Sequence, residues 1–352
     1  MAKHQAPEPH PVRDRAAVRT VVLAMVGLTF FVLAMIASYS GAFAKPTLHH
    51  MSVAVAGPQQ LVDGVRGQDT LAVTEVADAT AAREQVYDRK ADAGYVAAPG
   101  ELKIYVAGGG GKSVATAAET VGRAIAAKAG LAASVEDVAP ASAGDPSGTV
   151  EFYAIIFISI GASVGATVLG RLMGTVRTPL TLALRTATLA GFSALLAGAV
   201  TVYVDVILGA LTGHTWQVFG ALWLYAMAVG GAITGVAAAF GSAASLALTA
   251  FLVVIGNAAA AGPVGRPLLS GFYSTFTAIV PQGSGVSLLR SVSYFGGNGA
   301  QTPLVTLAIW GAAGCLLAIV ATASRVNYRA IYERFANGDG AVLRPRVLSP
   351  AD

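Results

Sequence analysis

The sequence predicts an α-helical integral membrane protein with six transmembrane helices, arranged as one helix near the N-terminus and a group of five. A small extracytoplasmic α/β domain is expected between helices 1 and 2. Of the 352 residues, 55% are hydrophobic and only 12% are charged, which is too little charge to cover a water-soluble globule of this size. The apolar residues also form long runs, and a single long polar stretch separates the first run from the rest.

Six apolar runs are long enough to cross a bilayer core about 30 Å thick, which needs about 20 helical residues. They cover residues 20–42, 152–170, 186–208, 218–240, 243–261 and 303–323. The chain therefore divides into an N-terminal segment, a first helix, an outer domain, a five-helix membrane domain and a tail, at residues 1–19, 20–42, 45–148, 152–323 and 324–352.

Basic residues near the helix ends predict that both termini are cytoplasmic. They gather before the first run, between the second and third runs, and after the last: Lys3, Arg13, Arg15, Arg19, Arg171, Arg177, Arg185, Arg325, Arg329, Arg334, Arg344 and Arg346. This is the pattern of the positive-inside rule, whereas the long stretch between residues 45 and 151 has a net charge of −4 and is expected outside. Because the positive charge flanks the membrane, we expect no nucleic-acid partner.

The first helix leaves one alternative open. Ala42-Phe43-Ala44 has the A-x-A form of a signal-peptidase site, so cleavage after Ala44 is possible. The apolar run before it is longer than a typical signal-peptide core, which favours a spanning anchor. The sole cysteine, Cys315, lies in the last run, so no intramolecular disulfide is expected in the outer domain.

Within the outer domain, alternating and helical patterns succeed one another. Strands are expected at residues 51–56, 71–76, 102–106 and 133–138, and helices at 78–90 and 113–129. A turn-rich linker at residues 140–148 returns the chain to the membrane.

The outer segment between the fifth and sixth helices is too apolar for an ordinary loop. We expect a helix at residues 267–280, a break at Pro281–Gly285, and a second helix at 286–295. Such a re-entrant hairpin would dip partway into the membrane, where non-helical backbone is tolerated only if protein or a water-filled cavity surrounds it. Its candidate key residues are Pro281, Gly283, Gly285 and Arg290.

The sequence resembles motifs for enzymatic chemistry only in part. Residues 108–113 read Gly-Gly-Gly-Gly-Lys-Ser and resemble a phosphate-binding loop, but the glycine required at position 106 is Val106. A flexible strand-to-helix turn is expected there. His49 and His50 read as a solvated pair rather than metal ligands. We expect no catalytic residues, no metal and no cofactor.

Asp205 is the single carboxylate well inside a predicted span. Such a residue marks a transport pathway or interface, or reaches the headgroups from near the helix end, and both interpretations stay open. Glycine pairs with i, i+4 spacing, such as Gly231 and Gly235, predict close helix packing within the bundle or between subunits.

The chain resembles the ABC-2 type permeases, in particular the YhgE/Pip-like branch, both in its order of one span, an outer domain and five spans and in its local sequence. The matching segments are Gly256-Asn257, residues 267–273, residues 281–290 and residues 294–297. In that family a P-x-G-x5-L-R element precedes a Y-F-G-G-like element and the final span. Here those places are taken by Pro281, Gly283, Leu289, Arg290 and Phe295.

The resemblance implies the permease subunit of an exporter in the bacterial plasma membrane, working as a homodimer or heterodimer with a separate cytoplasmic ABC ATPase. It places an ATPase-coupling loop at residues 170–185, with Arg171, Arg177 and Arg185 as contacts; topology alone also explains these arginines. An apolar bundle without an ion relay suits a lipid-like, peptide or amphiphilic substrate. Two alternatives remain: a non-transporting scaffold or receptor whose outer domain binds a cell-envelope ligand, and a secondary transporter using Asp205.

Overall fold

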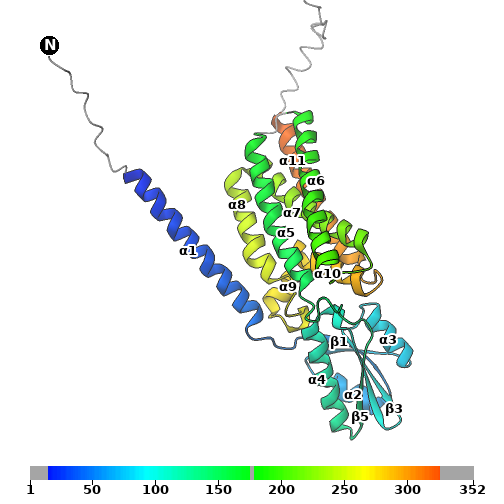
Figure 1. Ribbon diagram of the computed structural model, residues 1–352. Coiled ribbons are helices and arrows are strands. Elements are labelled where there is room, and N and C mark those ends of the chain that lie inside the picture. Colours follow the sequence, from blue (N-terminus) through cyan, green and yellow to red (C-terminus); the bar gives the residue numbers. More distant parts are fainter. Residues whose placement is uncertain (1–14, 175–177, 326–352) are drawn as a thin grey trace, which may run out of the picture.

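The computed structural model describes residues 15–174 and 178–325 and shows a helical bundle joined end to end with an α/β domain (Figure 1). Five of the described helices are long and apolar enough to cross a membrane. They are α1 (Arg15–Phe43), α5 (Val150–Leu172), α6 (Pro179–Thr201, extended by the π-helical η2, Val202–Ile207), α7 (Thr215–Phe240) and α11 (Gln301–Arg325). The predicted class, a multi-pass membrane protein with a small sheet, is confirmed at this level.

The sixth predicted span, residues 243–261, is a shorter apolar helix. It comprises α8 (Ser242–Phe251) and a π-helical segment, η3 (Leu252–Gly256). At a rise of about 1.5 Å per residue this helix is about 22 Å long, which is less than the bilayer core of about 30 Å. A turn at residues 259–260, a bend at residues 262–264 and a short 3-10 helix, η4 (Arg266–Leu268), follow before the next α-helix begins.

The α/β domain contains a five-stranded sheet in the order β2-β1-β3-β4-β5. Its strands are β1 (Met51–Ala56), β2 (Leu71–Glu75), β3 (Ala93–Ala98), β4 (Glu101–Val106) and β5 (Ala132–Asp137). All neighbours are parallel except β3 and β4, which pair Tyr95 with Ile104. The four predicted strands are present, and β3 is an additional strand at the centre of the sheet.

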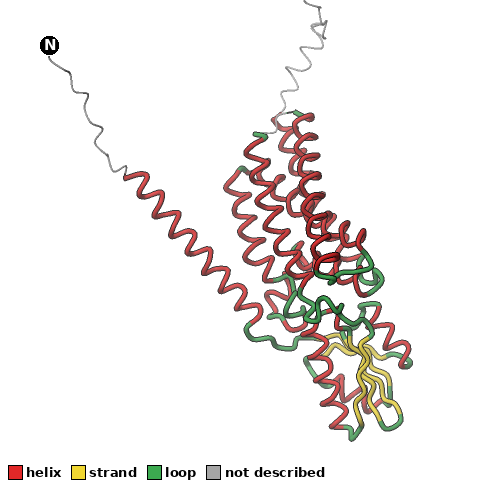
Figure 2. The backbone as a smooth tube through the Cα atoms, in the orientation of Figure 1, coloured by secondary structure: helices red, strands yellow, loops and turns green. Residues whose placement is uncertain are grey.

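Helices cover both faces of this sheet. α2 (Gln59–Arg66) and α4 (Lys112–Lys128) pack with one buried cluster and α3 (Ala79–Tyr87) with the other. The predicted helices at 78–90 and 113–129 correspond to α3 and α4, and the Asp78 carboxylate caps α3 by accepting from the Ala81 N–H. The first cluster also includes Ala258, Leu269 and Tyr273, so the core of the domain continues into the bundle. Loops gather at this boundary (Figure 2).

Two further helices, α9 (Gly271–Ile279) and α10 (Pro281–Tyr294), lie in the half of the bundle next to the α/β domain (Figure 1). The predicted break at Pro281–Gly285 is wrong in position, because these residues form the first turn of α10. Proline is favoured at the start of a helix, since its missing N–H would have no partner there. The break falls on Val280, whose backbone is extended. Most of α10 is buried.

Glycine packing joins the spanning helices to one another. A Cβ atom added to Gly235 of α7 would lie 2.2 Å from the carbonyl oxygen of Gly314 in α11, and one added to Gly314 would lie 2.4 Å from Gly231. Of the two expected uses of the Gly231–Gly235 pair, the structure shows packing within the chain. The two backbones are in direct contact.

Candidate functional site

A series of uncharged polar side chains extends from α1 into the interior of the bundle, and we call it the polar track. It is formed by Ser38 and Tyr39 of α1, Ser159 of α5, Tyr225 of α7, Asn257 directly after η3, and Gln282 of α10. The Gln282 amide nitrogen donates to the Ser159 hydroxyl at 3.1 Å and to the Leu252 carbonyl at 2.9 Å. Tyr225 lies beside Ser159, and Asn257 lies beside Tyr39.

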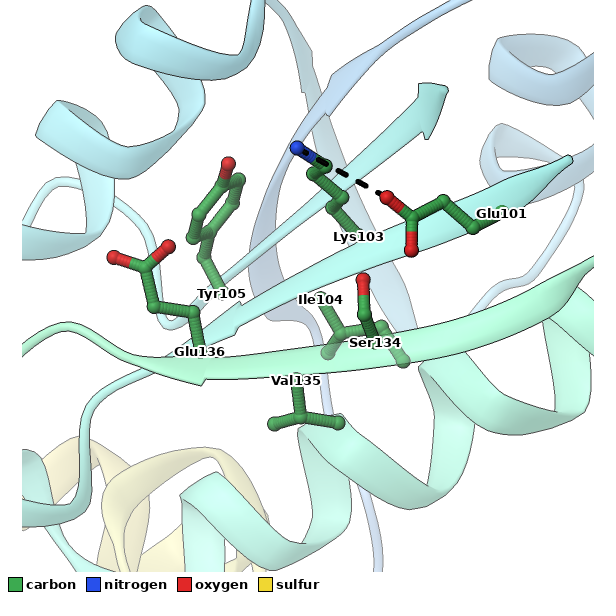
Figure 3. Close-up of a pocket in the computed structure, with 7 residues that line it drawn as sticks. All are labelled: Glu101, Lys103, Ile104, Tyr105, Ser134, Val135 and Glu136. Carbon is green, nitrogen blue, oxygen red and sulfur yellow. Dashed lines mark ion pairs between the residues drawn. The ribbon is translucent and has the colours of Figure 1, made fainter. Parts of the chain in front are cut away.

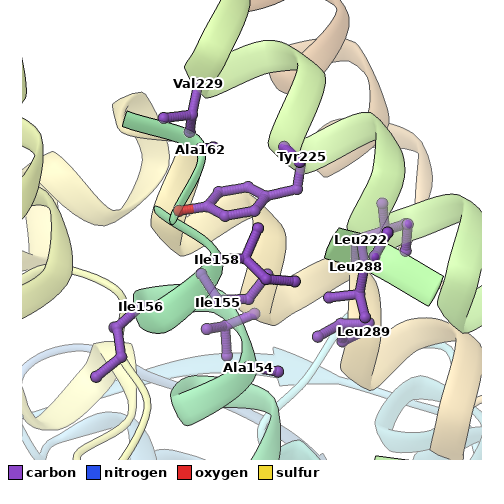
Figure 4. Packing of buried hydrophobic residues seen from close by; sticks show 14 of the residues in the cluster. Ala154, Ile155, Ile156, Ile158, Ala162, Leu222, Tyr225, Val229, Leu288 and Leu289 are labelled. Carbon is purple, nitrogen blue, oxygen red and sulfur yellow. The ribbon is translucent and has the colours of Figure 1, made fainter. Parts of the chain in front are cut away.

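The polar track reaches about half the depth of the bundle. Ser159 and Tyr225 stand nine and ten residues from the ends of α5 and α7 that face the α/β domain, or about 14 Å along each helix. Half of a bilayer core is about 15 Å. Tyr225 projects from α7 among apolar side chains, with its hydroxyl directed at α5 (Figure 4).

Several atoms of the polar track lack hydrogen-bond partners. Within the described residues, the Tyr225 hydroxyl, both amide atoms of Asn257 and Oε1 of Gln282 make no hydrogen bond of standard geometry. All three side chains are 0% exposed, and the Tyr225 hydroxyl and the Asn257 amide have only loose contacts, with Ser159 and Tyr39 respectively. Leaving a buried polar atom unpaired costs about 1–3 kcal/mol. Stability therefore does not explain the presence of these side chains, and unpaired buried groups of this kind occur at functional sites.

A second cluster, which we call the junction cluster, lies at the opposite end of α10, where the bundle meets the α/β domain. It contains Arg290, Tyr294, Glu151 and Arg89. The Arg290 guanidinium is buried and donates to the carbonyls of Ala261, Gly262 and Gly148 at 3.1, 3.0 and 3.4 Å.

Glu151 is 0% exposed, and both of its carboxylate oxygens lack a hydrogen-bond partner in the described part of the chain. It lies beside Tyr294 and near Arg290, whose charge acts on it. Buried ionisable side chains at this end of the bundle were not predicted from the sequence. Glu151 directly precedes the predicted span and was counted with the outer segment.

Arg89, at the end of α3, ties the α/β domain to α10. Its Nη1 atom donates to the Ser287 carbonyl at 2.7 Å and to the Ser291 hydroxyl at 2.5 Å, and its guanidinium lies 5.1 Å from the centre of the Phe295 ring. Burial, with a smaller effect from the charge of Arg290, lowers the pKa of Arg89 to about 10. Arg89 therefore stays charged at neutral pH.

The glycine-rich motif is a strand-to-helix turn, as expected, and it packs on the same end of α10. A Cβ atom on Gly109 would lie 2.4 Å from Cγ of Tyr294, and Gly111 has a φ of +134° beside Arg290. Ser113 accepts a hydrogen bond from the Gly265 N–H at 3.1 Å. Lys112 and Ser113 also border an open groove of about 610 Å³. The motif thus serves close contact between the domain and the bundle.

The arginines of the predicted coupling loop have different environments. Arg171 is exposed at the end of α5. Arg185 of α6 donates to the Gly174 carbonyl at 3.3 Å, shortly after the end of α5. Arg177 lies outside the described residues. In the predicted hairpin, Gly283 and Gly285 permit close packing, since added Cβ atoms would lie 2.1 Å from the Thr277 carbonyl oxygen and 2.6 Å from Ile155.

Asp205 lies in η2, at the end of α6, where it accepts a hydrogen bond from the Thr215 hydroxyl. Its side chain is partly exposed. Of the two interpretations left open by the sequence, this position favours a helix-end residue over a buried pathway carboxylate.

Two surface features, a histidine pair and a shallow depression on the sheet, offer fewer groups for binding a ligand. His49 pairs with the Thr47 hydroxyl at 2.7 Å, and the described residues contain no group of three His, Cys, Asp or Glu side chains suited to a metal. On the sheet, a shallow depression of about 290 Å³ is lined by Glu101, Lys103 and Glu136 among others (Figure 3). Its charges are paired already, Lys103 with Glu101 at 4.0 Å and Glu136 with Arg83 at 2.8 Å.

Comparison of the chain with known protein families, curated proteins and solved structures finds no match.

Proposed function

We propose that the chain is the permease subunit of an ABC-2 type exporter, which moves a lipid-like, peptide or amphiphilic substrate outward while a separate cytoplasmic ATPase hydrolyses ATP. The observation that carries this proposal is the position of α10. Gln282 at its start bonds to Ser159 in the middle of α5, and Tyr294 at its end packs on Gly109 of the α/β domain.

This position supports a re-entrant hairpin formed by α9 and α10. A helix of 14 residues measures about 21 Å and spans only part of the bilayer. A turn such as the one at Val280, placed at mid-depth, needs surrounding protein or a water-filled cavity. A passive anchor has no use for such a hairpin, whereas a transporter does.

The distribution of charge supports an external energy source. In the described spans the buried polar groups at mid-depth are uncharged, and Glu151 and Arg290 lie at the end of the bundle. A proton or cation relay would need ionisable groups at intervals across the membrane. The energy is therefore supplied by a partner ATPase.

We further propose that the α/β domain is extracytoplasmic and both termini are cytoplasmic, in the bacterial plasma membrane, with the permease working as a dimer. The turn around residues 170–185 then faces the ATPase. Arg171 is the exposed contact candidate in this turn, because Arg185 is engaged with Gly174.

The test is copurification of the full chain with the product of an adjacent ATPase gene, followed by ATPase measurements in lipid nanodiscs. We expect a stable complex whose ATPase rate responds to the permease. Arg171→Glu should weaken the complex by about tenfold, because it reverses a charge at the contact. Arg123→Glu, a reversal on the surface of α4, is the matched control. A missing complex together with an unresponsive ATPase rate would overturn the proposal.

The second candidate function is a scaffold or receptor, favoured by the shallow depression over β4 and β5 in Figure 3. Because the core of the α/β domain continues into residues 258–273, the test uses the full chain rather than the isolated domain. On this hypothesis Lys103→Glu abolishes function, whereas Arg171→Glu leaves it intact. The exporter predicts the reverse.

A further inference from the structure

We propose that the polar track is a binding site, inside the membrane, for an amphiphilic molecule whose polar group is uncharged and carries both hydrogen-bond donors and acceptors, as an amide or a sugar does. The molecule enters sideways from the bilayer between α1 and η3. This inference deepens the proposed export function and rests on it for the direction of movement; binding itself does not depend on it.

The unpaired atoms define the chemistry of the ligand. Asn257 offers one donor group and one acceptor, Gln282 offers an acceptor, and the Tyr225 hydroxyl offers either. A ligand amide or hydroxyl group would satisfy these atoms and so recover the hydrogen bonds that burial denies them.

A charged ligand group does not fit this site. The nearest Arg, Lys, Asp or Glu side chains along α10 and α5, those of Arg290 and Glu151, stand eight residues from Gln282 and Ser159 respectively, or about 12 Å along their helices. Arg290 is also engaged with three carbonyl groups. A phosphate, sulfate or ammonium group would therefore be desolvated without a counter-charge, which costs far more than burying a neutral polar group. The polar track selects for uncharged head groups.

The route of entry follows from the position of α1. This helix approaches the bundle only at the end that leads into the α/β domain (Figure 1), and most of its length is exposed. At that end the Ser38 hydroxyl donates to the Val254 carbonyl at 2.8 Å and accepts from the Tyr273 hydroxyl at 3.1 Å. Half-buried Tyr39 lies beside Asn257. The polar track thus begins at a seam between α1 and η3 that borders the bilayer.

The backbone at this seam provides an independent observation. η3 is π-helical, and short π-helical segments within α-helices occur frequently at functional sites. Gly256, its last residue, has no room for a side chain, since an added Cβ would lie 2.5 Å from Oε1 of Gln282. The site is closed in this conformation, and ligand entry requires α1 to move away from η3.

A binding site built from unpaired atoms has a distinctive signature in mutants. Asn257→Leu removes two unpaired polar atoms and keeps a similar volume, so it should leave the protein at least as stable as the wild type while it weakens ligand binding. A structural asparagine would show the opposite behaviour.

The experiment uses the full chain in phosphatidylcholine nanodiscs and a photoactivatable diazirine alkyl glucoside as the probe. An alkyl sulfate with the same chain and diazirine is the charged comparison. We expect the glucoside to label α1, η3 and α10, to be displaced by excess unlabelled alkyl glucoside, and to label more strongly than the sulfate. Asn257→Leu should reduce displaceable labelling by about tenfold. Ser193→Ala, which also removes an unpaired buried hydroxyl but lies on α6, should leave it unchanged.

Equal labelling by the sulfate, or full labelling of Asn257→Leu, would overturn the inference. Tyr225→Phe is the second variant, and it keeps the ring in place should Asn257→Leu fail to fold. Since no ATPase takes part, specific labelling without a stable ATPase complex would refute the exporter and leave the binding site standing. A stable ATPase complex without specific labelling would refute the binding site and leave the exporter proposal standing.

Discussion

The polar track and the junction cluster lie at opposite ends of α10 and differ in the charge of their buried side chains. In the junction cluster, Arg290 donates to three carbonyl oxygens and lies near Glu151, although both Glu151 carboxylate oxygens and the Tyr294 hydroxyl lack a hydrogen-bond partner within the described residues. In the polar track, neutral side chains leave four atoms unpaired. A buried charge is far more costly to leave uncompensated than a neutral group. The comparison indicates that the hydrogen bonds of Arg290 and Arg89 hold the domain to the bundle, whereas the polar track contains only neutral groups, whose unpaired atoms are available for another partner.

The largest effect is expected from Arg290→Met. This change leaves three carbonyls without their donor and removes the positive charge near Glu151, and should lower the apparent free energy of unfolding by about 3–5 kcal/mol. Thermal unfolding in detergent, followed by circular dichroism, measures it. Arg83→Met, which breaks an exposed ion pair, should cost at most about 1 kcal/mol. Adding Glu151→Gln to Arg290→Met should recover part of the loss, and equal stability of the two single variants would refute the role given to Arg290.

A smaller effect is expected from Gly109→Ala. The added Cβ would lie 2.4 Å from the Tyr294 side chain, and accommodating it should cost about 1–3 kcal/mol through displacement of the domain from α10. Thermal unfolding and protease sensitivity at residues 140–148 measure the change. Gly64→Ala, inside α2 with nothing within 4 Å, should instead stabilise slightly. If both variants changed thermal unfolding and protease sensitivity alike, the close contact at Gly109 would not contribute to stability.

The smallest effect is expected in the polar track itself. Tyr225→Phe removes a buried hydroxyl that has no partner, so the unfolding temperature should stay constant or rise slightly. Differential scanning fluorimetry measures the temperature. Loss of about 1 kcal/mol or more would show that the hydroxyl is bonded in the folded protein, and would erase the contrast between the two clusters.

The sequence predicted elements whose signal is local. Alternating residues predicted β1, β2, β4 and β5, and apolar runs predicted the five long helices. β3 was missed because its sequence, Ala-Gly-Tyr-Val-Ala-Ala, is Ala- and Gly-rich and does not alternate; a central strand covered on both faces has no reason to. The position of the break before α10 was missed because Pro281 is compatible with both a break and a helix start.

The candidate site was harder to predict because its residues come from distant parts of the chain. Ser159, Tyr225 and Gln282 are unremarkable singly, and only the packing of three helices brings them together. Asn257 and Gln282 gave a usable signal, since an amide within an apolar stretch needs a partner or a function. Glu151 was obscured by its place at the edge of a predicted span.

The contact between α7 and α11 has a consequence for how the protein is made. Gly231 and Gly235 pack directly against the backbone of residues 311–314. α11 is the last described helix to leave the ribosome. Synthesis proceeds from the N-terminus, so this face of α7 is in contact with lipid until α11 is inserted. The bundle therefore closes in a single late step, and a chain stopped before residue 301 would carry an open glycine groove into the membrane.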